Sequence, residues 1–414
     1  MTSLVFTGNN IKVLRARTFQ NLTELEELDL RSNYIRAFER AAFRKLVRLR
    51  RLDLSYNFFL WNPTELYLDL KNLTELRLSS TVTRPQLKKD WFIANMQLKI
   101  LLYAENRLDH IPIFAERRYG PLKTNLTELH LEDNEIREIN ASTLRGLTSL
   151  EHLFLCRNVI DFIANGTFRY MRNLKYLNLK GNPLLRLEHK SLVSNSIEFM
   201  NLAKTQLFSG QQYSSKHPLN INNSISSLDL SDTNLSTPLL NGFLKYYNVL
   251  RRLNVNQNNL TILTSEAFQK LQSLEELLVA NNSLTQISNS SLPPKLWRQM
   301  KTLDLSGNPF RCDCKLFKFS HWIKMKNFSY STKLLDNMQC VSYLKRTRQS
   351  FVVSRESNRL MLKCFAKESK FFLWSLIATV FVITFLSTFA SIVHRFRWNI
   401  RYWIFTHKVT RSII

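Results

Sequence analysis

The nine residues Leu25-Glu26-Glu27-Leu28-Asp29-Leu30-Arg31-Ser32-Asn33 decide the fold, because their pattern L-x-x-L-x-L-x-x-N returns along most of the chain. The closing position occurs thirteen times, mostly at intervals of 23 to 26 residues, and Thr replaces Asn at three of them. These positions are Asn9, Asn33, Asn57, Thr81, Asn106, Asn134, Asn158, Asn182, Thr205, Thr233, Asn258, Asn282 and Asn308. A period of this length predicts a stack of small repeating units rather than separate globular domains.

The leucines at positions 1, 4 and 6 of each unit turn inward, and no single unit can bury them alone. Stacking therefore builds one continuous core, and each L-x-L segment adds a short strand to a curved parallel sheet. The closing Asn has two donors and an acceptor for backbone groups of adjacent turns, whereas Thr81, Thr205 and Thr233 can satisfy fewer of them. Residues 1–308 resemble leucine-rich repeats, which implies an α/β leucine-rich-repeat solenoid: a curved horseshoe with the parallel sheet on its concave face.

Four of the five cysteines follow the last repeat, as Cys312, Cys314, Cys340 and Cys364. A zinc site is the alternative reading, but C-x-C followed by two isolated cysteines lacks the paired knuckles of such sites. Residues 309–370 resemble the C-terminal capping module of extracellular leucine-rich-repeat proteins, and this resemblance implies the pairs Cys312–Cys340 and Cys314–Cys364. Cys156 lies within a repeat, at a position expected to face the concave surface, either as a free thiol or in an intermolecular pair.

Residues 371–393 contain no charged residue over 23 positions, which is long enough to cross a bilayer as a helix. Every charged residue after this segment is basic: Arg395, Arg397, Arg401, Lys408 and Arg411. The excess of positive charge places residues 394–414 in the cytoplasm as a short tail and the repeats outside. The pattern predicts a single-pass type I membrane protein.

Eleven N-x-[ST] sequons lie on the predicted outer side, after Asn62 is discarded because Pro follows it. They are Asn21, Asn72, Asn125, Asn140, Asn165, Asn222, Asn234, Asn259, Asn281, Asn289 and Asn327. Residues 1–20 already follow the repeat pattern and contain neither a secretory leader nor a cysteine cap. Since sequons, disulfides and a membrane anchor all require export, we expect this sequence to be part of a longer chain.

The repeats, the four-cysteine cap, the single apolar segment and the basic, aromatic run His394-Arg-Phe-Arg-Trp-Asn-Ile-Arg-Tyr-Trp403 together resemble a Toll-like receptor. The resemblance implies an innate immune receptor of the plasma or endosomal membrane, which binds ligand through its repeats and signals by homo- or heterodimerisation. In that family a cytoplasmic TIR domain recruits adaptors, but only 21 residues follow Val393 here. The alternatives are a TIR-less decoy or co-receptor, and an adhesion or growth-regulating repeat receptor.

The predicted concave face is acidic although the whole chain has a formal charge of +26. Positions 3, 5, 7 and 8 of the repeats hold seven basic and twelve acidic residues, about −5 in total. Nucleic acid requires a contiguous row of Lys and Arg, so this face favours protein or microbial lipid and glycan ligands, while a basic lateral face leaves nucleic acid open. The two longest repeats, which end at Asn134 and Thr233, supply further ligand-contact candidates: Arg118, Tyr119, Tyr213 and His217.

Motifs for catalysis are missing from the sequence. The eight histidines show no metal-ligand spacing, and neither a G-x-S-x-G elbow nor a phosphate-binding loop occurs. Paired carboxylates on a solenoid are far more often solvated surface than a hydrolytic pair. We therefore expect a binding protein rather than an enzyme, with no catalytic, cofactor-binding or metal site.

Overall fold

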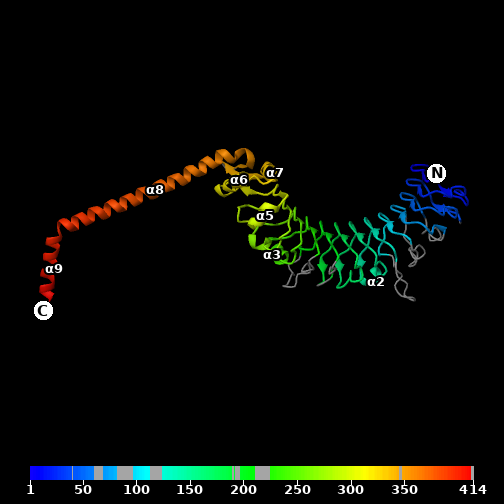
Figure 1. Ribbon diagram of the computed structural model, residues 1–414, viewed down its shortest axis with the longest axis horizontal. Coiled ribbons are helices and arrows are strands. Elements are labelled where there is room, and N and C mark those ends of the chain that lie inside the picture. Colours follow the sequence, from blue (N-terminus) through cyan, green and yellow to red (C-terminus); the bar gives the residue numbers. More distant parts are fainter. Residues whose placement is uncertain are drawn as a thin grey trace. The chain divides into compact units, whose positions relative to one another are not determined.

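The computed structural model describes residues 1–39, 41–59, 69–81, 97–111, 124–188, 191, 196–209, 224–344 and 347–411. The chain forms two compact units, Met1–Ser354 and Arg355–Ile414. The first unit holds the repeats and the cap, and the second holds the end of the chain (Figure 1).

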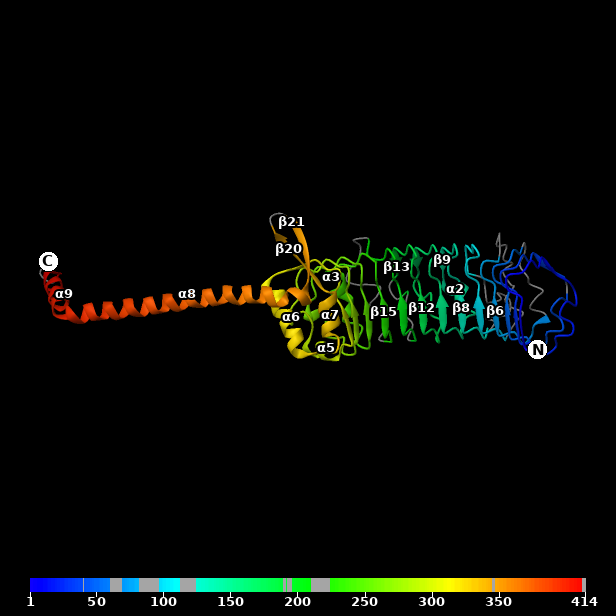
Figure 2. The ribbon, with the colours of Figure 1, turned by 90° about the horizontal axis from the view of Figure 1, so that it is seen from above.

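A parallel sheet of thirteen strands runs through the first unit, and its strands follow one another in chain order. Each strand begins six residues before a closing Asn or Thr of the repeat pattern. The strands are β1 (Ser3–Val5), β3 (Glu27–Asp29), β5 (Arg51–Asp53), β6 (Glu75–Arg77), β7 (Ile100–Leu102), β8 (Glu128–His130), β10 (His152–Phe154), β12 (Tyr176–Asn178), β14 (Phe199–Asn201), β15 (Ser227–Asp229), β16 (Arg252–Asn254), β17 (Glu276–Leu278) and β18 (Thr302–Asp304). Figure 2 shows them side by side on the concave side of the solenoid, which confirms the predicted leucine-rich-repeat horseshoe.

The leucines of the pattern form the core between the sheet and the returning segments. Leu150, Leu153 and Leu155 are typical, since all three are fully buried in a stack with their counterparts from adjacent repeats. Removing one leucine side chain from water stabilises the fold by about 1.5–3 kcal/mol, and the stack repeats this gain along the solenoid.

The closing asparagines form a ladder inside the solenoid, as their donors and acceptors predict. Asn158 donates to the carbonyls of Leu131 (2.8 Å) and Leu155 (3.1 Å) and accepts from the amide of Ile136 (3.1 Å). Thr81 donates to its own repeat, at the carbonyl of Leu78 (2.8 Å). Each such Asn therefore joins two repeats, which confirms the expected structural role of these residues.

Shorter elements cover the return path of the chain. A three-stranded sheet is formed by β9 (Glu138–Ile139), β11 (Phe162–Ile163) and β13 (Arg186–Leu187), and a two-stranded one by β2 (Val13–Leu14) and β4 (Ala37–Phe38). The described residues of this path include four short helices: α2 (Ala141–Leu144), α3 (Thr237–Leu244), α4 (Ser265–Phe268) and α5 (Pro294–Gln299). None of these elements contributes a strand to the thirteen-stranded sheet.

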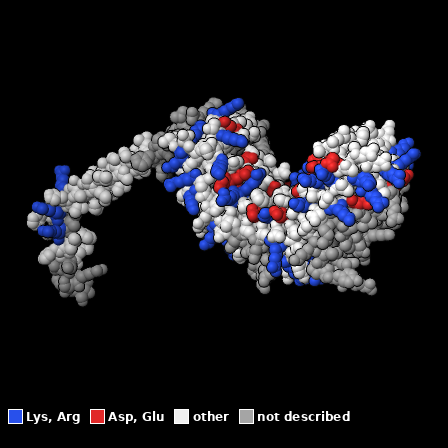
Figure 3. Space-filling model, turned by 45° about the vertical axis from the view of Figure 1, so that its right-hand side comes forward, with Lys and Arg blue, Asp and Glu red and all other residues white. Residues whose placement is uncertain are grey.

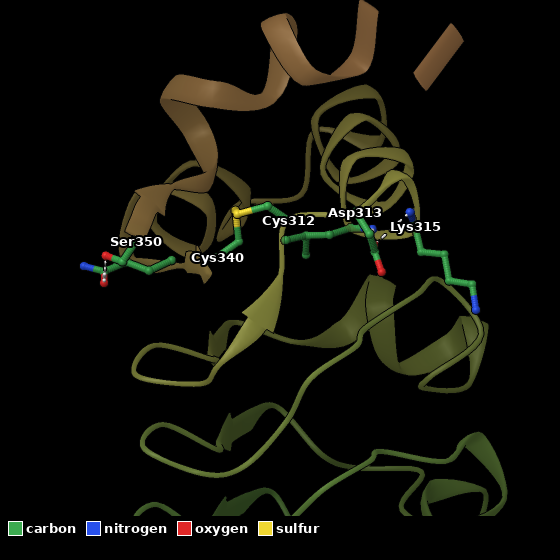
Figure 4. Close-up of a disulfide and its surroundings, with 7 residues drawn as sticks. Cys312, Asp313, Lys315, Cys340 and Ser350 are labelled. Atoms are coloured by element: carbon green, nitrogen blue, oxygen red, sulfur yellow. Dashed lines mark hydrogen bonds between the residues drawn. A yellow bond between two sulfur atoms is a disulfide. The ribbon is translucent and has the colours of Figure 1, made fainter. Parts of the chain in front are cut away.

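A small cap closes the C-terminal end of the solenoid. It consists of β19 (Phe310–Arg311), α6 (Cys314–Lys326), α7 (Ser331–Asn337), β20 (Gln339–Leu344) and β21 (Thr347–Val352). The carboxylate of Asp313 caps α6 by accepting from the amides of Lys315 and Leu316, both at 3.0 Å. The Cys312–Cys340 disulfide ties the start of α6 to β20 (Figure 4).

The second unit contains two helices, which meet at a turn at Phe396. Helix α8 (Val353–Arg395) has 43 residues and begins at the end of the first unit, while α9 (Arg397–Arg411) has 15. Among the described residues, Leu373–Arg395 within α8 is the one stretch of helix that is long and apolar enough to cross a membrane.

Candidate ligand-binding face

Two side chains of every strand of the large sheet point to the concave side, because the central leucine, or Met200 in β14, points into the core. The register aligns these side chains in columns across the sheet, about 4.8 Å apart. One column runs through Glu128, His152, Tyr176 and Phe199, and the other places His130 beside Phe154. The concave face therefore brings together residues that lie 23 to 28 positions apart in the sequence.

The N-terminal part of this face neutralises its own charges. Arg51 binds Glu75 at 2.8 Å and Glu27 at 3.3 Å, and Arg77 binds Glu75 at 2.6 Å. Burial raises the pKa of Glu75, but hydrogen bonds and the charges of both arginines outweigh burial, so its pKa lies below the ordinary value. Arg31 binds Asp29 in the same way, at 2.8 Å. This region is a closed network with little free charge for a ligand.

The centre of the face is built around His130. Its Nε2 lies 2.7 Å from Glu128 and its Nδ1 lies 2.8 Å from Glu132, so that the protonated ring donates to both carboxylates. Burial lowers the pKa of His130, but the hydrogen bonds and charges of Glu132 and Glu128 outweigh burial and raise it above its ordinary value. The second oxygen of Glu132, Oε2, is buried and has no hydrogen-bond partner among the described residues. Oε2 of Glu132 is therefore a hydrogen-bond acceptor of this cluster that the described residues leave unused.

Aromatic rings continue from His130 across the next three strands. Phe154 stacks on the imidazole at 4.1 Å between ring centroids, Tyr176 lies 5.0 Å from Phe154, and Phe199 lies 6.3 Å from Tyr176. We call Phe154, Tyr176 and Phe199 the aromatic row. Phe199 keeps 44% of its surface exposed, whereas the other two are half-buried. The row offers apolar contact area at one end of an acidic cluster.

Cys156 lies two residues after Phe154, just beyond the end of β10. It is free, as one of the two sequence-based alternatives predicted, but only 6% of its surface is exposed. Its charge interactions with Glu132 and with Tyr176, both on the concave face, agree with the predicted position, but neighbouring side chains cover the thiol. Burial, followed by the charge of Glu132, raises the pKa of Cys156, so the thiol stays protonated and unreactive at neutral pH.

In the C-terminal part of the face, aspartate side chains accept hydrogen bonds from backbone amides two residues further along the chain. Asp229 accepts from the amide of Ser231 at 2.9 Å, and Asp304 accepts from the amide of Ser306 at 2.9 Å. Glu276 lies 3.5 Å from Arg252. Figure 3 shows acidic and basic side chains next to one another in the hollow of the solenoid. The face is a mixed surface, and its apolar and acidic groups meet at the centre.

Apart from the concave face, a recess of about 530 Å³ lies on the segments that lead into β12, β14, β15, β16 and β17. Its lining includes the basic residues Arg172, Lys175 and Arg251 and several serines. Lys175 lies 2.7 Å from Glu151, and Arg251 lies 3.5 Å from Glu275. Two of its three cations are thus already paired with carboxylates.

The sequence-predicted site residues have different outcomes. Arg118, Tyr119, Tyr213 and His217 lie outside the described residues, so their role as ligand contacts stays a prediction. The Cys312–Cys340 pair is present, and Cys314 and Cys364 are disulfide-bonded as well, so the end of the chain holds two disulfides. No group of three or more His, Cys, Asp or Glu residues that could hold a metal ion occurs in the described part of the chain.

Ten of the eleven predicted glycosylation asparagines are described, and Asn222 is the exception. Nine of the ten are exposed and Asn140 is half-buried, where its side chain caps α2 by accepting from the amides of Ser142 and Thr143. Exposure makes these residues accessible for modification, and the modification itself stays a prediction.

Reasoning from the sequence missed His130 and the aromatic row. It counted charges at the concave positions but did not follow the apolar residues at the same positions, although all four stand beside the central Leu or Met of a strand. Aligning the repeats and reading each column for aromatic side chains as well as charges finds them.

Comparisons with known proteins agree with this architecture. The leucine-rich-repeat family model matches residues 1–59, 124–184 and 248–310. Mouse podocan is 27% identical over 276 residues (59% of this chain and 42% of podocan), and human Toll-like receptor 3 is 28% identical over 244 residues (58% and 24%). The matched region thus spans less than half the length of each relative.

Solved structures share the fold. The crystal structure of a TLR13–ssRNA13 complex superposes with a TM-score of 0.64 at 22% identity, covering 85% of this chain and 52% of that one. An internalin from Listeria monocytogenes superposes with a TM-score of 0.57 at 20% identity, covering 82% and 86%. The chain folds as a leucine-rich-repeat solenoid, and among the described residues a disulfide-bonded cap and one apolar helix follow its repeats.

Proposed function

We propose that this protein is a single-pass type I membrane receptor of Toll-like type, which binds a protein or a microbial lipid or glycan on the centre of its concave face. The observation that carries the binding site is the contact of the aromatic row with the His130 cluster. Tyr and Phe rings give large contact areas and are frequent binding hot spots, while nearby polar groups fix the ligand's orientation. Phe199 keeps 44% of its surface exposed at the end of this row, and Oε2 of Glu132 has no hydrogen-bond partner among the described residues.

The membrane topology follows from the end of the chain. Leu373–Arg395 is 23 residues long, or about 35 Å as a helix, which exceeds the roughly 30 Å hydrocarbon core of a bilayer. The positive charges that follow favour a cytoplasmic C-terminus, so the repeats, sequons and disulfides lie on the extracellular or luminal side. The location is the plasma membrane or an endosomal membrane.

The Toll-like assignment draws on the combination of repeats, cysteine cap, apolar helix and basic, aromatic run, together with the similarity to Toll-like receptor 3. On this proposal ligand binding brings two receptors together, and a cytoplasmic TIR domain beyond Ile414 recruits adaptors.

The protein has no enzymatic role. An adhesion or growth-regulating receptor is the alternative, because the relatives also include proteins other than Toll-like receptors, such as podocan. Nucleic acid is the less favoured ligand. Lys175 and Arg251, two of the three basic residues that line the recess of about 530 Å³, are already paired with carboxylates and are less available to phosphate groups.

The first test is to sequence both ends of the transcript. A leader upstream and a TIR-coding stretch downstream are expected. A message that ends after Ile414 would overturn signalling by this protein and leave the decoy or adhesion receptor.

The binding site is tested with arrays of secreted proteins, bacterial glycans and lipids. We expect Tyr176→Ser and Phe199→Ser to weaken binding of any captured ligand at least tenfold, since each removes a hot-spot ring worth about 1.4 kcal/mol or more. Ile262→Ser is the matched control, because Ile262 is 50% exposed but lies outside the strands of the concave sheet. Equal binding by all variants would refute the concave site.

A further inference from the structure

Helix α9 carries an exposed aromatic stripe. Trp398, Tyr402 and Phe405 are spaced at i, i+4 and i+7, so they share one face of the helix. Their exposed fractions are 67%, 72% and 68%. Three large rings in one line on a water-exposed helix form an amphipathic surface that suits an apolar partner.

A basic stripe borders the aromatic one. The guanidinium carbons of Arg397 and Arg401 lie 5.7 Å and 5.8 Å from the centre of the Trp398 ring. Lys408 occupies a register position of the same stripe, while Asn399 and Thr406 occupy positions on the opposite side of the helix. Figure 3 shows the basic residues gathered at this end of the second unit, next to the uncharged length of α8. Trp403 and Ile404, exposed by 60% and 50%, lie on the side of α9 away from the aromatic stripe, so the basic and polar positions separate two apolar surfaces of unequal size.

The sequence neighbours of α9 define the partner. The apolar segment of α8 ends at Arg395 and α9 begins at Arg397, so a membrane-spanning α8 places the first turn of α9 at the level of the lipid headgroups. A helix with an aromatic face flanked by Arg and Lys lies in the plane of such an interface, and its cations interact with anionic lipids. No acidic residue occurs after Glu368 to oppose them.

We propose that α9 is an interfacial helix that lies on the inner leaflet and binds anionic phospholipids. Its aromatic stripe faces the acyl boundary, and Arg397 and Arg401 reach the phosphate and carboxylate groups of the lipids. The proposal rests on the proposed topology and adds a lipid-binding surface to it. Anchored in this way, α9 fixes the direction in which the chain leaves the membrane.

The test uses the full chain with Cys156→Ser, reconstituted into vesicles of phosphatidylcholine alone or with phosphatidylserine. An environment-sensitive fluorophore is attached to a single added cysteine in three variants: Tyr402→Cys on the aromatic stripe, Asn399→Cys on the polar side as the matched control, and Thr384→Cys inside the apolar segment. We expect blue-shifted emission, quenched by lipids labelled near the headgroup, from position 402 but not from position 399. Adding Arg397→Gln and Arg401→Gln should remove this shift in phosphatidylserine vesicles.

Each outcome separates the proposals. A probe at position 384 that reports water contradicts the membrane span and with it the proposed topology. A probe at 384 that reports the bilayer, combined with equal emission from positions 402 and 399, overturns the interfacial helix alone. A shift at 402 that disappears when the protein is diluted in lipid assigns the stripe to a second copy of the chain and also overturns the proposal.

Discussion

The asparagine ladder allows a stability prediction to be worked out from individual hydrogen bonds. Asn158 is buried and satisfies the carbonyls of Leu131 and Leu155 and the amide of Ile136. Asn158→Ala leaves these three buried groups unpaired, and each costs about 1–3 kcal/mol. Since water can enter part of the small cavity, we expect a total loss of about 3–6 kcal/mol in the free energy of unfolding.

Asn158→Thr should be intermediate. Thr81 and Thr205 show that a threonine at this position keeps the bond to its own repeat, at 2.8 Å and 2.9 Å, so only the groups of the neighbouring repeat are left unpaired. Asn173→Ala is the control, because Asn173 is exposed and donates one bond to the carbonyl of Thr148; its loss costs under about 1 kcal/mol.

The assay is denaturant unfolding of the purified chain in detergent, followed by circular dichroism. The reasoning is refuted if Asn158→Ala shifts the unfolding midpoint no more than Asn173→Ala, or if Asn158→Thr is as damaging as Asn158→Ala. The first result would mean that the ladder contributes little, and the second that bonds between repeats contribute nothing beyond those within one.

Three further predictions follow from the site and the cap. Because the pKa of folded His130 lies above its ordinary value of 6.5, its bridge to Glu128 and Glu132 stabilises the fold fully below about pH 6.5 and is lost as the pH rises through the raised pKa. The melting temperature of His130→Gln should therefore fall furthest below that of the parent chain at acidic pH, and a pH-independent difference would contradict this. Replacing Cys312 and Cys340 together by Ser opens a link across 28 residues and should cost ~3.5 kcal/mol in the free energy of unfolding, measured as above; an unchanged midpoint would show that this disulfide adds nothing to the stability of the cap. The thiol of Cys156 should react with maleimide only after denaturation, because it is buried; rapid labelling of the native chain would disprove its burial.

The repeat architecture was predictable because it depends on local periodicity. Leucines at positions 1, 4 and 6 and the closing Asn recur in every unit, so their roles follow from the spacing alone. The C-x-C arrangement at Cys312 similarly identified the cap through its resemblance to known modules.

The candidate site was harder to predict, because it depends on register between strands. His130 meets Phe154, and Arg51 meets Glu75, only when residues 24 positions apart are aligned. Summing charges over the whole face predicted an acidic surface but hid the closed network around Glu75. The burial of Cys156 similarly depends on packing against neighbouring repeats, which its place in the pattern does not show.

The central claim, that this leucine-rich-repeat protein is a membrane receptor with its repeats outside, is tested most directly by mapping its orientation in cells. The natural transcript is expressed with an epitope tag at Arg411, and the cap is detected with an antibody against α6. The account predicts that the antibody stains intact cells or the lumen of endosomes, that the tag is accessible only from the cytoplasm, and that exposed sequons such as Asn165 and Asn259 carry N-glycans. Staining of the cap and the tag on the same side of the membrane, or an unglycosylated chain, would contradict it.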